Sequence, residues 1–195
     1  MAGEPRADAR RNRERILMVA RVVVAEQGTE ASLRDIARRA EVGLGTLYRH
    51  FPTREALLEA LLRQGFDRLA ARAEALADAG SPREALLEWL RDFAGGAGAY
   101  RGLAGSMMAT LNDEASPLYA SCHGMQAAAG RLLERAQAVG HIRGDIDGTD
   151  LFALVNALSW ITDQAPSLAP RRDHLFSLVM DGLAAPERGG TKRLT

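Results

Sequence analysis

The sequence has little cysteine and no long apolar run, and each shortage excludes a class of protein. Cys122 is the only cysteine among 195 residues, which rules out an intrachain disulfide and a cysteine-based zinc site. The most apolar early stretch, residues 16–25, is too short to span a bilayer and contains Arg21. No small-residue cleavage site follows the Arg10-Arg11 pair, so an export signal is not predicted. We therefore expect a soluble, cytoplasmic protein with no membrane partner.

The apolar residues follow a helical period along most of the chain. No segment alternates cleanly with period two, whereas long segments repeat apolar residues every three to four positions. We expect an all-α protein: three helices in an N-terminal domain, then a bundle of about six. The helices are predicted over residues 9–27, 33–40, 44–50, 54–78, 82–93, 100–111, 117–139, 149–164 and 171–183. Residues 1–8 and 186–195 lack this periodicity and are expected to fray, the latter as a disordered tail.

Two short predicted helices joined by a tight turn, with a supporting helix before them, form a helix-turn-helix arrangement over residues 32–51. Ser32 is placed to cap the first short helix. Ala37 and Ala40 are small where the two helices must cross, and Leu47 fills the core between them. Gly43 leaves the start of the second short helix narrow. In this motif the second helix enters the major groove of DNA.

Local charge supports a DNA partner, although the 25 basic and 25 acidic residues of the whole chain balance. Residues 1–54 contain eleven arginines and seven acids, a net charge of +4, which leaves −4 on the remainder. This asymmetry is typical of a DNA-binding head on an acidic domain. For Arg10, Arg11, Arg13 and Arg15, ahead of the motif, a solvated helix face and a DNA contact both stay open.

Residues 9–62 resemble the DNA-binding domain of TetR-type transcriptional regulators. Residues 33–58 are close to that family's signature, and the segment GTLYRHFP, residues 45–52, is highly specific. The remainder is similar to one helical ligand-domain subgroup through residues 132–137 (LLERAQ), 140–143 (GHIR) and 181–183 (DGL). The resemblance implies a homodimeric, ligand-responsive regulator, most simply a repressor that a small molecule releases from a palindromic operator.

The resemblance also implies which residues approach DNA. Thr46, Tyr48 and His50 would lie on the recognition helix, with Tyr48 and His50 near phosphates. Arg54 stands where the family has a basic residue at the start of the fourth helix. The full implied set is Ser32, Arg34, Gly43, Leu44, Gly45, Thr46, Tyr48, Arg49, His50 and Arg54.

Two positions depart from the family pattern. Glu41 occupies a turn position usually held by glycine, where a positive φ costs a non-glycine residue roughly 1 kcal/mol. Gly43 stands where a capping serine is common, so a side-chain phosphate contact is not expected from it.

The second domain is expected to bind an effector and to dimerise. The candidate effector residues are Trp89, Phe93, Tyr100, Met107, His123, Asn156 and Trp160. Asn156 and Trp160 share a helix face and would give an apolar cavity a polar handle; core packing and solvent exposure are the alternatives. A small, largely apolar effector is expected. The candidate dimer contacts are Leu154, Leu158, Ile161, Leu175, Leu178 and Val179.

We expect a DNA-binding domain over residues 1–55 and an effector-binding and dimerisation domain over residues 56–185. No catalytic residue, cofactor or metal is predicted. Residues 145–150 resemble a calcium loop only faintly, and a turn followed by a helix cap is the better interpretation. The rival hypothesis is an all-α small-molecule-binding protein or enzyme whose basic head is a docking module. The lack of clustered His, Asp and Glu argues against it.

Overall fold

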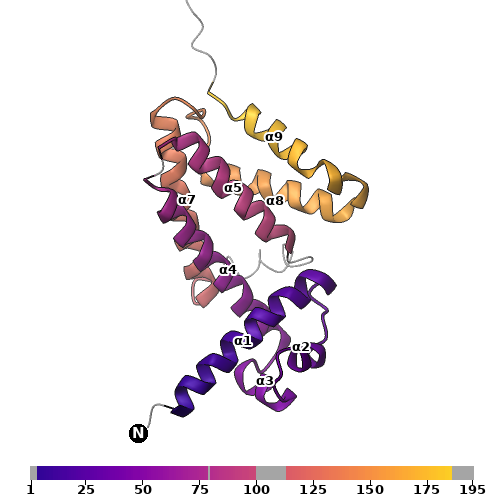
Figure 1. Ribbon diagram of the computed structural model, residues 1–195. Coiled ribbons are helices and arrows are strands. Elements are labelled where there is room, and N and C mark those ends of the chain that lie inside the picture. Colours follow the sequence, from indigo (N-terminus) through magenta and orange to yellow (C-terminus); the bar gives the residue numbers. More distant parts are fainter. Residues whose placement is uncertain (1–3, 79, 100–112, 186–195) are drawn as a thin grey trace, which may run out of the picture. The chain divides into compact units, whose positions relative to one another are not determined.

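A computed structural model describes residues 4–78, 80–99 and 113–185, and within these ranges the chain is helical without a strand (Figure 1). The all-α prediction is confirmed. The helices are α1 (Glu4–Gln27), α2 (Leu33–Arg39), α3 (Leu44–His50), α4 (Arg54–Leu76), α5 (Pro82–Ala99), α7 (Pro117–Ala138), α8 (Gly148–Gln164) and α9 (Arg172–Gly182), with a 3-10 helix η1 (Pro166–Arg171) before α9. The helix predicted over residues 100–111 and the predicted tail lie outside the described residues.

Two helices extend beyond their predicted ends. α1 begins at Glu4 instead of residue 9, so residues 4–8, which were expected to fray, are helical. α5 continues through Gly95 and Gly96 to Ala99, although the glycines were expected to end it near residue 93. Glycine costs a helix only about 1 kcal/mol relative to alanine. A helix that is already nucleated and packed can therefore propagate through such positions.

The chain divides into two compact units, and the division falls within α4 after Arg68. The first unit comprises the described residues up to Arg68 and those from Gly96 to Gly124. The second comprises Leu69–Gly95 and the described residues from Met125 onward. The predicted boundary at residue 55 lies at the start of α4, directly after the break at Pro52.

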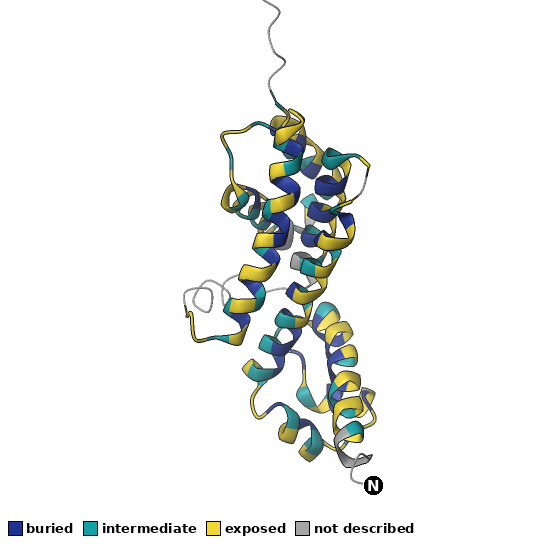
Figure 2. Cartoon of the chain, turned by 90° about the vertical axis from the view of Figure 1, so that its left-hand side faces the viewer, coloured by how far each residue is buried: buried dark blue, intermediate teal, exposed yellow. Residues whose placement is uncertain are grey.

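In the first unit, α1 packs against α2 and α3 and buries one stripe of its surface (Figure 2). Among the buried side chains of α1 to α4 in this unit are Ile16, Leu17, Ala20, Val23, Val24, Ile36, Ala37, Leu47, Phe51, Leu57 and Leu61. Gly28, at φ +80°, ends α1. Ser32 Oγ accepts the backbone N–H of Asp35 at 3.4 Å, so the predicted cap of α2 is confirmed.

The second unit has an aromatic cluster at its centre. Trp89 and Phe93 of α5 stack with ring centroids 5.5 Å apart, and Phe152 of α8 meets Phe93 edge-on at 4.9 Å. The indole Nε1 of Trp89 donates to the Leu69 carbonyl oxygen at 2.8 Å. Ion pairs from Arg72 to Glu88 and Asp92 hold the last turns of α4 against α5. Hydrogen bonds and ion pairs thus join α4 to α5, and aromatic contacts join α5 to α8.

The predicted turn and cap before α8 is confirmed as a capping box. Asp147 Oδ1 accepts the backbone N–H groups of Thr149 at 2.7 Å and Asp150 at 3.2 Å, and Asp150 Oδ2 accepts the Asp147 N–H at 3.0 Å. The N–H groups of Asp150 and Thr149 hold the pKa of Asp147 below its ordinary value. These carboxylates therefore serve the helix terminus.

The described residues contain no group of three or more His, Cys, Asp and Glu side chains that could hold a metal ion. None of the described helices combines the length and the apolar character that a membrane crossing requires.

Candidate nucleic-acid interface

Helices α2 and α3 are joined by a turn that the backbone itself holds closed. The Ala40 N–H donates to the Ile36 carbonyl at 2.8 Å, and the Val42 N–H donates to the Ala37 carbonyl at 3.0 Å. Ala37 and Ala40 are buried, which confirms that small residues stand where the helices meet. The turn therefore fixes the direction in which α3 leaves α2.

The turn places Glu41 in the left-handed region at φ 53°, the only non-glycine residue with positive φ in the described part of the chain. This confirms the positive φ that was expected at Glu41, where the family usually has glycine. Side chains other than glycine pay roughly 1–2 kcal/mol in this region because Cβ approaches the following carbonyl. The motif keeps its geometry here at the expense of local strain.

We expect Glu41→Gly to raise the free energy of unfolding by about 0.5–1 kcal/mol. The gain from relieved strain exceeds the entropy that glycine adds to the unfolded chain. Urea denaturation followed by circular dichroism measures it. The matched control is Glu30→Gly, which removes the same charge at an exposed loop position without positive φ. Equal stability changes in the two variants would contradict the strain at Glu41.

The recognition-helix candidate, α3, has one face in the core and one toward solvent. Leu47 and Phe51 are 0% and 2% exposed, as a helix face spaced by four residues requires. Gly45, Tyr48 and Arg49 are exposed on the other side, with Tyr48 at 45%. Leu44, Thr46 and His50 are half-buried at its edges, and Gly43 is the exposed cap residue. The outer face is therefore a short strip with a tyrosine and an arginine on it.

The absence of a side chain at Gly45 is not required by the fold. A Cβ atom built at Gly45 has no described atom within 4 Å, and one at Gly43 meets only Thr46 Oγ1 at 3.8 Å, an ordinary contact. Glycine inside a helix is unfavourable relative to alanine. The surface at Gly45 is therefore open, and the fold leaves room for a larger residue there.

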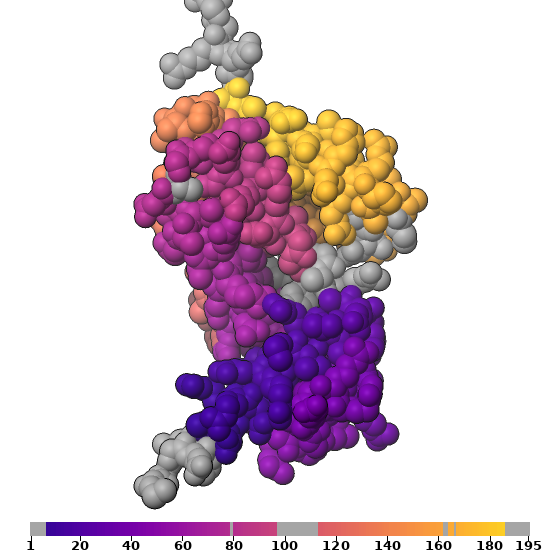
Figure 3. Space-filling model, in the orientation of Figure 1, coloured from indigo at the N-terminus to yellow at the C-terminus, as the bar shows by residue number. Residues whose placement is uncertain are grey.

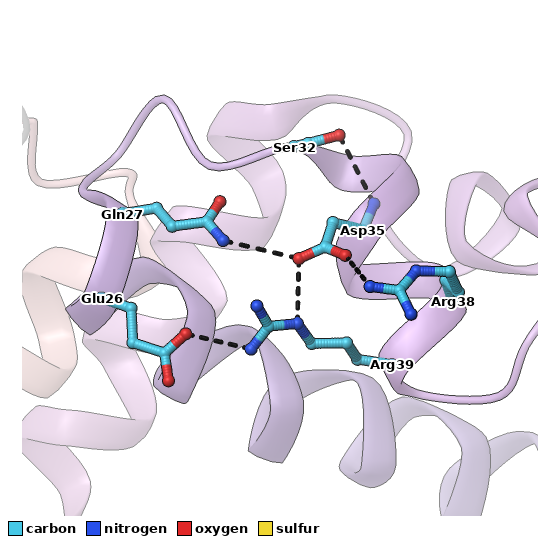
Figure 4. Close-up of polar contacts among 6 residues, drawn as sticks. All are labelled: Glu26, Gln27, Ser32, Asp35, Arg38 and Arg39. Atoms are coloured by element: carbon cyan, nitrogen blue, oxygen red, sulfur yellow. Dashed lines mark hydrogen bonds and ion pairs between the residues drawn. The ribbon is translucent and has the colours of Figure 1, made fainter.

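The charges on α2 form a connected network with the end of α1 (Figure 4). Asp35 pairs with Arg38 and, at 2.9 Å, with Arg39 Nε, while Arg39 Nη1 donates to Glu26 at 3.0 Å. The Arg38 guanidinium holds the pKa of Asp35 below its ordinary value. Gln27 Nε2 completes the network by donating to Asp35 at 3.5 Å.

This network divides the basic residues of the head into two groups. Arg38 and Arg39 are locally compensated, whereas the exposed Arg34 and Arg49 have no ion-pair partner among the described residues. Sequence reasoning missed the network, although the spacing of Asp35, Arg38 and Arg39 by three and four residues was a signal for it.

Arg54 makes contacts inside the first unit that the family resemblance did not imply. Its Nη1 donates to the carbonyl oxygens of Thr29 and Ala31, at 2.8 and 2.6 Å, and its side chain is half-buried. These carbonyls belong to the loop between α1 and α2. The guanidinium of Arg54 thus joins the start of α4 to the loop between α1 and α2.

The effector candidates do not gather into one described cavity. The described residues Leu86, Trp89, Leu90, Ala129, Gly148, Leu151 and Phe152 line a cavity of about 10 Å³, room for about one water molecule. Trp89 lines it, and Phe93 stacks behind Trp89. Tyr100 and Met107 lie outside the described residues.

The expected polar handle on α8 is not at this cavity. Asn156 is half-buried, and its Nδ2 donates to the Phe152 carbonyl of its own helix at 2.8 Å. Trp160 is 58% exposed and His123 is also exposed, the latter beside Tyr119. The reason is that α8 is apolar around most of its circumference. Its buried stripe is Leu151, Val155 and Ser159, a set that sequence periodicity does not single out.

The outward faces of α8 and α9 expose large apolar side chains. Leu154, Trp160 and Ile161 of α8 are 36%, 58% and 38% exposed, and Leu178 of α9 is 55% exposed. Leu158, Leu175 and Val179 are half-buried. We call the four exposed side chains the α8–α9 patch. It contains three of the six residues predicted to form a dimer contact, and Trp160 in addition.

Comparisons with known proteins match both parts of the chain. Residues 16–61 match the family described as bacterial regulatory proteins, tetR family, and residues 81–185 match the C-terminal domain described as transcriptional regulator SbtR-like. The chain is 40% identical over 72 residues to the HTH-type transcriptional repressor KstR of Mycolicibacterium smegmatis, covering 36% of this chain and 35% of that repressor. It is 37% identical over 73 residues to the regulator UidR of Escherichia coli, covering 37% of each. These matches span about a third of the curated relatives' length.

Two solved structures are similar over nearly their whole length. The TetR transcriptional regulator SCO0520 from Streptomyces coelicolor is 39% identical, with a TM-score of 0.69, covering 89% of this chain and 98% of that one. The TetR transcription regulatory protein from Mycobacterium vanbaalenii is 35% identical, with a TM-score of 0.63, covering 92% and 99%.

Proposed function

Because the chain belongs to the TetR family of bacterial regulatory proteins, we propose that it binds an operator in double-stranded DNA as a homodimer and regulates transcription there. The observation that carries the proposal is the two-sided α3, with Leu47 and Phe51 in the core and Gly45, Tyr48 and Arg49 exposed. A rigidly seated short helix with an open outer face can enter a major groove. A chromosomal partner also places the protein in the cytoplasm.

The residues on the outer face of α3 and at its edges fall into two groups, one suited to base edges and one to phosphates. Leu44 and Thr46, at the start of the helix, lie where base edges are read, and Gly45 lets the backbone come close. Tyr48, Arg49 and His50 follow at positions suited to phosphate oxygens, which accept from hydroxyl, guanidinium and imidazole donors. Ser32 and Arg34 at the start of α2 would meet the neighbouring phosphates.

We propose repression as the mode of regulation and a small, largely apolar molecule as the effector. The similar protein KstR of Mycolicibacterium smegmatis is named a repressor. Buried aromatic side chains at Trp89 and Phe93, with no ionised group among the residues that line the described cavity, favour an uncharged ligand in the second unit. An enzyme with a docking head is not favoured, since the similar proteins are regulators.

Gly45→Ala tests the proposed interface directly. We expect unchanged or slightly higher stability, because Cβ has free space and alanine favours the helix. We expect operator affinity to fall at least about tenfold, since the added methyl group holds the backbone away from DNA and costs about 1.4 kcal/mol or more. Thermal unfolding and fluorescence anisotropy with a selected operator give the two values.

The control for this experiment is Gly130→Ala in α7, where a Cβ atom also meets no described atom within 4 Å. It changes a helical glycine in the second unit and is expected to leave operator affinity unchanged. Full affinity in Gly45→Ala would remove the outer face of α3 from the proposed interface.

A further inference from the structure

The first three turns of α1 project beyond the core of the first unit. α1 spans 24 residues from Glu4, yet from residue 7, where the burial of its side chains is described, the first buried one is Ile16, at 0% exposure. At 1.5 Å per residue, about 18 Å of helix precedes that contact. Figure 1 shows these turns leading away from the other helices of the unit, past α3. We call residues 4–15 the α1 extension.

The α1 extension is held helical by its own side chains. Arg10 Nε lies 3.6 Å from Glu14, Arg11 pairs with Asp8, and Arg15 Nη2 donates to Asn12 Oδ1 at 3.0 Å. Such pairs three or four residues apart stabilise an exposed helix by a few tenths of a kcal/mol each. They do not bury the guanidinium groups, since the side chains of Arg10 and Arg11 are 80% and 65% exposed.

One contact fixes the position of the α1 extension relative to the end of α3. The Arg13 guanidinium lies over the Phe51 ring, 5.3 Å from its centroid, and Phe51 is the residue that ends α3. The extension therefore leaves the core from a point fixed against the end of the recognition-helix candidate. A ligand seated on the outer face of α3 would have the extension beside it.

The charge of the extension selects the chemistry of that ligand. Residues 7–15 carry four arginines and two acids, and the arginines at 10, 11 and 15 lie outside the core. Arg10 and Arg11 are paired with Glu14 and Asp8 on the surface of the helix, as Arg38 is paired with Asp35. Their side chains nevertheless stay 80% and 65% exposed, and the segment keeps a net positive charge, so a polyanion can reach them.

We propose that the α1 extension lies along the phosphate backbone of the duplex just outside the bases that α3 reads, and lengthens the bound site at both ends. This inference rests on the proposed function. Its contacts are to phosphates and so raise affinity for every sequence equally. They also make binding more salt-dependent than the contacts of α2 and α3 alone would.

The test is the double variant Arg10→Ala/Arg11→Ala, measured by anisotropy from low to moderate salt and by hydroxyl-radical footprinting on a selected operator. The slope of log affinity against log salt is negative, and each lost phosphate contact makes it shallower by about 0.9. Two lost contacts per chain therefore make it shallower by about 3.6 in a dimer. The footprint should shorten at both outer ends. Arg10→Lys/Arg11→Lys keeps the charges and should keep the slope.

Arg21→Ala/Arg171→Ala is the matched control, because it removes two exposed arginines outside the extension. Its slope and footprint should match those of the wild type. If the Arg10→Ala/Arg11→Ala variant matches the control in both measurements, the α1 extension does not touch DNA. Operator binding by the wild type would still leave the proposed function intact. If the wild type itself selects no DNA sequence, the proposed function fails first.

Discussion

Trp160→Glu with Leu178→Glu should convert the protein to monomers and abolish operator binding at concentrations where the wild type is saturated. Both side chains are more than half exposed on the α8–α9 patch, and a patch of this kind marks an interaction surface. A symmetric contact repeats each substitution on both subunits, so four carboxylates would have to be buried without partners, at several kcal/mol. Two half-sites about 34–36 Å apart cannot then be held by one linked pair of heads.

Analytical ultracentrifugation gives the oligomeric state, and far-ultraviolet circular dichroism confirms that the monomer is folded. Val139→Glu is the matched control. Val139 is 53% exposed at the end of α7 and lies off the patch, so its variant should remain dimeric. A double variant that still sediments as a dimer would place the interface elsewhere on the chain.

Arg54→Ala should lower the free energy of unfolding by about 2–3 kcal/mol and leave the salt dependence of operator binding unchanged. The change removes two charged hydrogen bonds at once and leaves the Thr29 and Ala31 carbonyls without this donor; bonds to charged groups contribute about 1.5–3 kcal/mol. Arg54→Lys should recover part of the loss, since an ammonium can reach one carbonyl. Urea denaturation gives the stability and anisotropy the salt slope.

Arg49→Ala provides the opposite pattern on the same head. Arg49 is exposed on α3, so its loss should alter stability by less than about 0.5 kcal/mol while weakening operator binding. If Arg54→Ala instead kept full stability and lost about one unit of salt slope, Arg54 would be a phosphate ligand as the family resemblance implied.

Features that depend on neighbouring residues could be predicted from the sequence, whereas a contact between distant parts of the chain could not. Ser32, Glu41, Leu47 and the Asp147 cap were predicted correctly because each depends on residues within one or two turns. Arg54 could not be interpreted from its neighbours. Its partners lie more than twenty residues earlier in the chain, and they are backbone carbonyls, which every sequence contains.

α8 and α1 show two further limits. α8 has apolar residues on several faces, so its pattern predicts the helix but not the side that turns inward, and Trp160, a candidate for the effector cavity, is 58% exposed. The first turns of α1 have no apolar stripe, so residues 1–8 were expected to fray, and residues 8–11 are exposed among the described residues. Periodicity detects burial, and a helix built to meet another molecule can lack it.

The contrast between the two tryptophans makes the protein its own optical probe. Trp89 is enclosed at 1% exposure and bonded to a carbonyl, while Trp160 is largely in water. In a dissociated subunit their emission should differ accordingly, blue-shifted for Trp89 and red-shifted and easily quenched for Trp160. With Trp160→Phe, fluorescence reports the interior of the second unit alone. With Trp89→Phe, it reports only the surface where subunits are proposed to meet, and dilution should turn that signal red.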